Sequence, residues 1–259
     1  MPVASARVPQ SAFKDHFSRV AAQYASFRPR YPAELFDYLA GLAPARSLVW
    51  DCACGTGQAS IDLAARFDAV IATDASEQQI THAQPHPRIQ YRVAPAEKSG
   101  IEPDSVDLAT VAQAVHWFDH EAFYAEVRRV LRPGGVLAVW GYGSGHLDDP
   151  APDGVFTEFL SQTVGPFWPP ERHLVEEGYR SLPFPFPAIE PPDFGMFQDW
   201  TLEQLLGYAR SWSATARYID RHGVDPVAGF AARLAPLWGD PQRRRRLTWP
   251  LAIRIGRKP

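Results

Sequence analysis

A short run of small residues and two carboxylates could form a nucleoside site. Residues 49–57 are Val-Trp-Asp-Cys-Ala-Cys-Gly-Thr-Gly, so a buried strand leads into a turn of small residues. Glycine at Gly55 and Gly57 can adopt positive φ and lets a ligand approach the backbone closely. Asp74 ends the next apolar run, where a carboxylate can accept both hydroxyls of a ribose. This geometry is typical of the crevice at the carboxyl end of a first strand.

The charge at the start of this turn distinguishes between nucleotide classes. A dinucleotide fingerprint needs a third glycine or alanine after Gly55 and Gly57, and Ser60 stands there. Asp51 would repel phosphates and would favour an ammonium or sulfonium group. The sequence therefore predicts a cationic nucleoside, with a nicotinamide dinucleotide as the alternative.

Strands and helices alternate through the first 145 residues, which predicts an α/β fold with a mostly parallel sheet. One helix begins at Ser76, whose side chain can cap it. Arg-Pro-Gly-Gly at 132–135 is a stop signal between a helix and a strand. The expected strands are 47–50, 69–73, 89–93, 106–112, 136–140 and 247–255, and the other expected helices are 33–42, 58–66, 121–131, 202–221 and 227–237.

The second part of the chain has a different composition. Ten of the 25 prolines fall within residues 150–192, and five of the eight tryptophans lie from residue 168 onward. These features predict a loop-rich aromatic cap. The expected division is an N-terminal lid and first helix (1–45), a cofactor-binding core (46–145), a cap insertion (146–192), and C-terminal helices and closing strands of the core (193–259).

Composition excludes several classes of protein. Hydrophobic residues make up 46% and charged residues 21%, which are ordinary globular values. The net charge of -3 disfavours a nucleic-acid partner, and we expect the four arginines at 243–246 to form a solvated turn. Two cysteines in one tight segment and the lack of a long apolar run predict a cytoplasmic protein without a membrane partner. The oligomeric state stays open.

The order of these motifs resembles that of class I S-adenosylmethionine-dependent methyltransferases, over residues 24–140. Further similar segments are residues 93–97, 105–118 and 128–139. Arg-Pro-Arg-Tyr-Pro at 28–32 and His-Trp-Phe at 116–118 are most similar to the type 11 small-molecule branch, which includes trans-aconitate methyltransferase. The resemblance implies a Rossmann-like, mostly parallel seven-stranded sheet flanked by helices, with a cap inserted in the C-terminal half.

The resemblance also implies S-adenosylmethionine as the cofactor. Two positions depart from the family pattern. Ala53 replaces the first glycine of the motif, and Glu97 stands later than the usual acidic residue after the third strand. The implied cofactor-binding residues are Tyr24, Arg30, Asp51, Ala53, Gly55, Gly57, Asp74, Ala75, Ala96, Glu97 and Gln113.

The acceptor of the methyl group is expected to be a small molecule, with a carboxylate as one candidate. A carboxylate nucleophile needs no general base, whereas a phenol, amine or hydroxyl could use His116, which is otherwise a structural histidine. His116 and His120 have metal-like spacing, but we expect no metal site. A nicotinamide-dependent oxidoreductase and a catalytically silent cofactor-binding protein are the alternatives. The expected acceptor-binding residues are His116, Trp117, Trp168, Tyr179 and Trp212.

Overall fold

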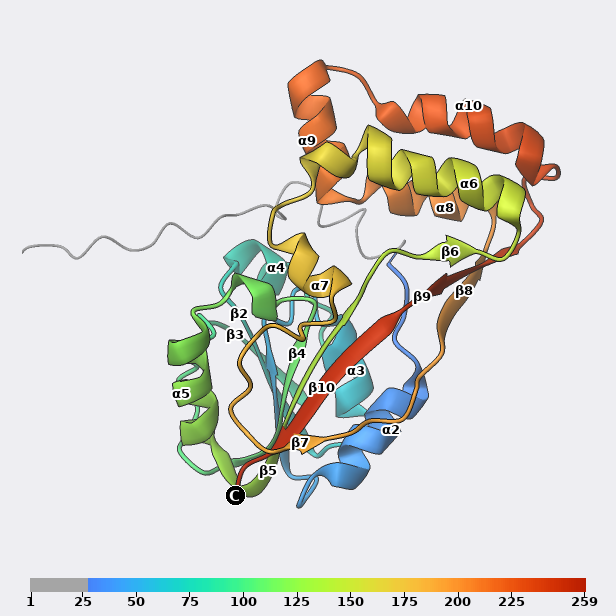
Figure 1. Cartoon of the computed structure of the whole chain (residues 1–259). Helices are drawn as coiled ribbons and strands as arrows, with labels where there is room; N and C mark the ends of the chain where they lie inside the picture. The colour runs from blue at the N-terminus through green and yellow to red at the C-terminus, as the bar shows by residue number, and fades with distance from the viewer. Residues whose placement is uncertain (1–27) are drawn as a thin grey trace, which may run out of the picture.

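The computed structural model describes residues 28–259, so the expected role of Tyr24 lies outside the described residues. Figure 1 shows a large lobe, in which helices cover a sheet, and a smaller helical lobe joined to it by long strands. The elements of the large lobe are α2 (Ala33–Leu42), β1 (Leu48–Cys52), α3 (Gln58–Ala64), β2 (Ala69–Asp74), α4 (Glu77–Thr81), β3 (Ile89–Val93), β4 (Val106–Ala112), η2 (Val115–Trp117), α5 (His120–Val130), β5 (Leu131–Tyr142), α7 (Arg172–Glu176), β7 (Ala188–Ile189) and β10 (Leu251–Arg257).

The main sheet has seven strands in the order β3-β2-β1-β4-β5-β10-β7. Its first five strands are parallel, while β10 is antiparallel to both β5 and β7. One apolar cluster fills the face under α5, and another fills the face under α2 and α3 (Figure 1). Because both faces are covered, the central strands are nearly continuous apolar runs. The predicted Rossmann-like, mostly parallel seven-stranded fold is confirmed.

Two predicted strands differ from those in the structure. Strand β5 begins directly at Leu131, and its pairing with β4 shifts register between Val106 and Leu108, so residues 132–135 form an irregularity within the strand and not a separate turn. The predicted strand at 247–255 is two strands, because Pro250 has no backbone N–H to continue the ladder. The chain changes sheets there, from β9 (Arg245–Trp249) to β10.

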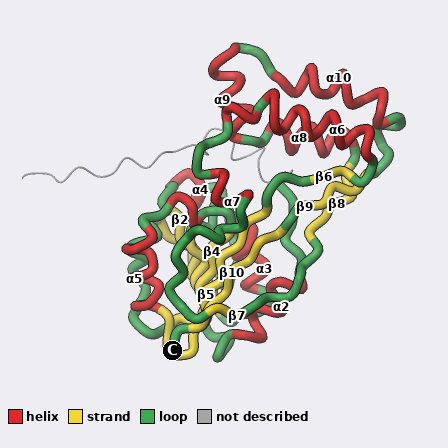
Figure 2. Tube along the Cα trace, in the orientation of Figure 1, coloured by secondary structure: helices red, strands yellow, loops and turns green. Residues whose placement is uncertain are grey.

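The smaller lobe, which we call the cap, combines two distant parts of the chain. It contains a three-stranded sheet in the order β6-β9-β8, which lies between the helices of the cap and the main sheet (Figure 2). The predicted helix at 202–221 is interrupted at residues 211–212. Besides β9, the cap elements are β6 (His146–Leu147), α6 (Pro150–Glu158), η3 (Phe159–Thr163), η4 (Gly165–Phe167), β8 (Met196–Trp200), α8 (Leu202–Arg210), α9 (Ser213–His222) and α10 (Pro226–Trp238).

The predicted domain boundaries stay a prediction. Contacts between the elements cross these boundaries in two places. Within residues 146–192, α7 packs on β5 and η2, and β7 joins the main sheet. Within residues 193–259, the helices α8, α9 and α10 share an apolar core with α6. Contacts between α6 and α10 cannot be inferred from local sequence, because about 70 residues separate the two helices in the chain.

The arginines at 243–246 lie at the start of β9, within the cap. Arg245 is buried and donates to Asp149 over 2.6 Å, and Arg246 pairs with Asp199 over 2.9 Å. The expected solvated turn is therefore partly wrong, because two of the four arginines are held by acidic residues of the cap. No helix among residues 28–259 combines the length and apolar composition that a membrane span requires.

Candidate functional site

Every second residue of the loop after β1 has a left-handed backbone conformation. Ala53, Gly55 and Gly57 have φ of 54°, 57° and 87°. A Cβ at Gly57 would collide with the hydroxyl of Tyr91 on β3, so the small residue is required at that position. Ala53 adopts the same conformation with a Cβ, which costs roughly 1–2 kcal/mol. The loop consequently follows a tight path with glycine backbone open to a ligand.

Asp51 points into the protein and does not face solvent. Ser60 of α3 donates to its Oδ2 over 2.5 Å, and Thr110 of β4 donates to its Oδ1 over 2.9 Å. Burial raises the pKa of Asp51 from 3.8 to about 6, although both hydroxyl groups oppose that shift. The carboxylate thus braces the loop against the helix and the neighbouring strand. Sequence reasoning missed Ser60 and Thr110, whose signal is a buried hydroxyl in an otherwise apolar segment.

Asp74 joins the ends of β1 and β2. Its Oδ2 accepts from the backbone N–H of Gly55 over 2.8 Å, and its Oδ1 accepts from that of Ser76 over 2.8 Å. A carboxylate offers about four lone-pair positions, so it can accept further hydrogen bonds beyond these two. Ala75 is exposed beside it. Val93, paired with Asp74 in the sheet, is 53% exposed and offers an apolar surface at the same edge.

The segment after β3 contacts the β4–α5 connection. Ala96 is buried, and Glu97 accepts from the backbone N–H of Asp119 over 3.2 Å. Asp119 in turn caps α5 by accepting from the N–H of Ala122. In this structure the carboxylate of Glu97 therefore stabilises the start of α5.

Gln113 leaves β4 in a left-handed conformation with φ of 58°. Its backbone N–H donates to the carbonyl of Trp140 over 2.8 Å, and its side-chain amide donates to that of Tyr142 over 3.0 Å. A non-glycine residue at positive φ is strained and persists only where its surroundings hold it in place. The exits of β4 and β5 are therefore tied together at the carboxyl edge of the sheet.

His116 and Tyr179 form a close pair beyond the exit of β4. The hydroxyl of Tyr179 lies 3.2 Å from Nδ1 of His116, and the two rings stack with centroids 5.9 Å apart. The ring centroid of Trp117 lies 4.8 Å from that of His116. Burial lowers the pKa of His116 to about 4, so its imidazole is neutral at pH 7.

The aromatic residues of the cap approach the same region. Trp168 and Trp212 lie 5.6 Å apart between ring centroids, and Tyr208 packs on Trp212 at 5.2 Å. The guanidinium of Arg172 lies 4.0 Å from the ring of Trp168. Its charge lowers the pKa of both His116 and Tyr208, so Arg172 lies near both side chains. Sequence reasoning missed Arg172 and Tyr208, which no motif identifies.

The predicted cofactor-binding role of Arg30 stays a prediction. Arg30 is exposed and lines a cavity of about 400 Å³ with Glu34 and Asp193. Its neighbour Tyr31 is partly buried, with its ring centroid 6.2 Å from that of Tyr142.

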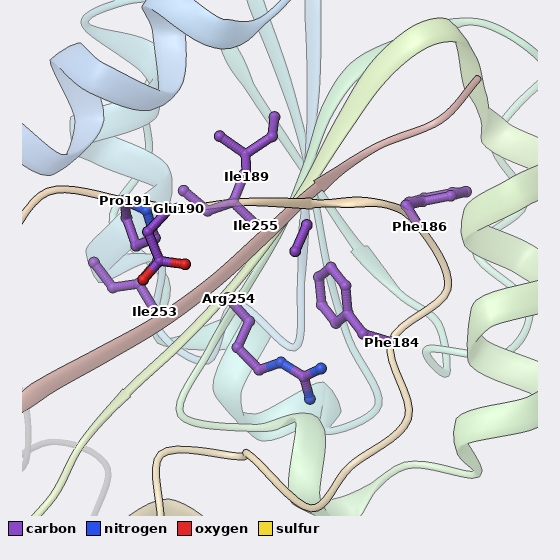
Figure 3. Close-up of a pocket in the computed structure, with 9 residues that line it drawn as sticks. Phe184, Phe186, Ile189, Glu190, Pro191, Ile253, Arg254 and Ile255 are labelled. Carbon is purple, nitrogen blue, oxygen red and sulfur yellow. The ribbon is translucent and has the colours of Figure 1, made fainter.

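Neither cysteine forms a disulfide, and burial raises the pKa of both thiols, Cys52 and Cys54. Residues 28–259 contain no group of three or more His, Cys, Asp or Glu side chains that could hold a metal ion. A second cavity, of about 340 Å³, opens at the edge of the main sheet (Figure 3). Phe184, Arg254 and Ile255 are among its lining residues, and none of the predicted site residues lines it.

Comparison with known proteins identifies the family. A family model described as a methyltransferase domain matches residues 50–139. A protein of Dictyostelium discoideum that is named as a methyltransferase is 34% identical over 216 residues, which cover 82% of each chain. An uncharacterized methyltransferase of Mycobacterium tuberculosis is 32% identical over 176 residues, or 67% of each chain.

A solved structure extends this match over most of the molecule. A chain named as a type II methyltransferase from Anaeromyxobacter dehalogenans superposes with a TM-score of 0.83 at 50% identity, over 89% of this chain and 98% of that one. The family match rules out the nicotinamide-dependent oxidoreductase as an interpretation. The chain therefore belongs to the class I S-adenosylmethionine-dependent methyltransferases, and S-adenosylmethionine is its cofactor.

Proposed function

We propose that this methyltransferase acts on a small carboxylate, as the resemblance to the trans-aconitate methyltransferase branch suggests. The observation that carries the proposal is the aromatic junction between the cap and the main sheet. Trp212, Tyr208 and Tyr179 are buried there; Tyr208 packs on Trp212, and Tyr179 contacts His116. Ligand pockets for small molecules are apolar and aromatic, with a few polar groups that fix orientation. A buried junction of this composition suits a compact acceptor better than a macromolecular surface.

The cofactor fits the carboxyl edge of the sheet in this proposal. Asp74 accepts the ribose hydroxyls with its remaining lone pairs, while Ala75, Val93 and Ala96 lie beside the base. The backbone at Gly55 and Gly57 borders the methionine part of the cofactor. Asp51 supports this loop from inside the protein through its hydrogen bond with Ser60. Ala53 narrows that end of the loop by one methyl group. Glu97 acts indirectly, by holding the start of α5.

The bound cofactor supplies a methyl group that its sulfonium has already activated. The remaining task of the chain is to place the acceptor oxygen in line with that group and to exclude water. Correct placement can contribute about 7–11 kcal/mol in well-oriented cases. We assign this positioning to the mouth formed by residues 113–117 and to the wall formed by Trp168, Tyr179 and Trp212.

Calorimetry with S-adenosylhomocysteine tests the cofactor site. We expect Asp74→Ala to weaken binding at least tenfold, because two hydroxyl acceptors and the brace to Gly55 are lost. Asp68→Ala is the matched control, since Asp68 is exposed and lies just before the other end of β2. Unchanged affinity in Asp74→Ala would refute the ribose assignment.

Turnover with a panel of small acids and phenols tests the acceptor, with products detected by mass spectrometry. Methyl esters of one or more acids are the expected products. Methylation of phenols alone would overturn the carboxylate assignment. Cofactor binding without any product would favour the catalytically silent protein, for which Ala53 is the one hint in the sequence.

A further inference from the structure

The buried hydroxyl of Tyr179 determines which nitrogen of His116 carries the proton. Tyr179 is 1% exposed, and within residues 28–259 the only hydrogen-bond partner of its hydroxyl is Nδ1 of His116. A buried donor without an acceptor costs about 1–3 kcal/mol. If Nδ1 donated to Tyr179, the phenol proton would have no acceptor and Nε2 would have no donor. The phenol therefore donates, and Nδ1 accepts.

The position of Tyr179 is fixed by its surroundings. The backbone of Tyr179 has a φ of 59°, and the guanidinium of Arg254 donates to the Tyr179 carbonyl over 2.7 Å. Gly141 makes room for the ring, since a Cβ there would come within 2.8 Å of the hydroxyl. The hydroxyl consequently stays on Nδ1 and does not rotate toward a different partner.

A neutral imidazole carries one proton, so acceptance at Nδ1 places that proton on Nε2. Burial keeps His116 neutral at pH 7, and the charged or titratable groups that act on it are Glu171, Arg172 and His120. No partner for Nε2 occurs in the part of the chain that the structure describes. His116 therefore has a free N–H and no free lone pair.

We propose that His116 is a hydrogen-bond donor to the carboxylate of the acceptor, and that Tyr179 is the positioning residue that fixes its tautomer. The proposal rests on the proposed function and replaces the expected role of His116 as a general base. A second donor lies in the same region. The indole N–H of Trp168 is buried with no partner in the described chain, beside the Arg172 guanidinium. Two N–H donors in one region suit an oxyanion.

The chemistry of the acceptor agrees with this assignment. A carboxylate oxygen forms the new O–C bond with its own lone pair, while the C–S bond breaks and its electron pair goes to sulfur. No proton leaves the acceptor, so no base is needed. A phenol or alcohol would have to lose a proton, and an Nε2 that already carries hydrogen cannot accept it.

Nitrogen NMR of the full chain, labelled at histidine and without ligands, tests the tautomer. We expect the His116 proton on Nε2 in the wild type and a mixture of tautomers in Tyr179→Phe. Tyr124→Phe is the matched control, because Tyr124 also stacks on a histidine but donates to the carbonyl of Pro183. A proton on Nδ1 in the wild type overturns the proposal. This measurement uses no acceptor, so it stands apart from any failure of the proposed function.

Kinetics on an accepted carboxylate test the donor role. We expect His116→Ala to lower kcat/KM by about tenfold to a hundredfold, the range for a lost hydrogen bond to a charged group. His116→Gln should recover a large part of that loss, because its amide N–H can reach the place of Nε2–H. The pH profile of the wild type should show no basic group that must lose a proton. A Gln variant as inactive as the Ala variant, or a titrating base that His116→Gln abolishes, overturns the donor role.

Discussion

Ser60 holds the carboxylate of Asp51 over 2.5 Å inside the protein, where each residue is at most 1% exposed. Because α3 carries Ser60 and β1 carries Asp51, this hydrogen bond closes the loop that faces the cofactor. Thr110 occupies the other carboxylate oxygen. The two bonds do not fully replace the lost water, so the pKa of Asp51 rises to about 6.

This raised pKa predicts a pH-dependent stability. The native protein binds more protons at Asp51 than the unfolded chain does between about pH 3.8 and pH 6, so the free energy of unfolding falls as pH rises through that window. The full difference is about 3 kcal/mol. Asp51→Asn removes this pH-dependent contribution to the free energy of unfolding. Urea unfolding from pH 4 to pH 8 should therefore show the variant gaining stability relative to the wild type as pH rises.

The control for this series is Asp68→Asn, at an exposed position between α3 and β2. It measures the effect of losing a carboxylate from the surface. Parallel pH curves for the wild type and Asp51→Asn would show that Asp51 is not the origin of the effect.

The left-handed conformation of Ala53 predicts that glycine is the better residue there. Ala53→Gly removes roughly 1–2 kcal/mol of strain and adds about 0.4–1 kcal/mol of chain entropy to the unfolded state. We expect a net gain of up to about 1.6 kcal/mol in the free energy of unfolding, measured by urea unfolding. Ala83→Gly lies in a loop without positive φ and should lose stability instead. Loss of stability in both variants would contradict the strain argument.

The parts of the molecule that were predicted depend on local patterns. A few neighbouring positions encode each of three features: the turn after β1, the acidic end of β2, and the residue that begins α4. Ser76 does begin that helix, and its side chain accepts from the N–H of Gln79. Parallel pairing then follows from the alternation of strands and helices. Asp51 was singled out for its charge, while its orientation depends on Thr110, a residue far along the chain.

The parts that were missed depend on contacts between distant segments. Arg172 and Tyr208 carry no motif, and they become candidates only because the fold brings α7 of the large lobe and α8 of the cap together. Pro250 cannot donate to a ladder, but periodicity alone does not tell a bulge from a change of sheet. Pairing of β9 with β6 and β8 decides that point.

The arginines at the start of β9 predict unequal effects of two neighbouring substitutions. Arg245 is 8% exposed, and it donates to Asp149 and to the carbonyls of Leu237 and Trp238. Arg245→Met keeps the apolar stem but leaves these acceptors without a donor. We expect the melting temperature to fall by at least about 4 °C. Calorimetry should show unchanged affinity for S-adenosylhomocysteine, because this region lies outside the proposed cofactor site.

Arg243→Met is the matched control, since Arg243 is exposed two residues earlier in the same run. Surface substitutions of this kind usually change the free energy of unfolding by no more than about 0.5 kcal/mol. Equal melting temperatures for the two variants would mean that the run is a solvated turn, as the sequence alone predicts. A large fall confined to Arg245→Met would mean that burial at one position, and not the charge of the run, gives these arginines their role.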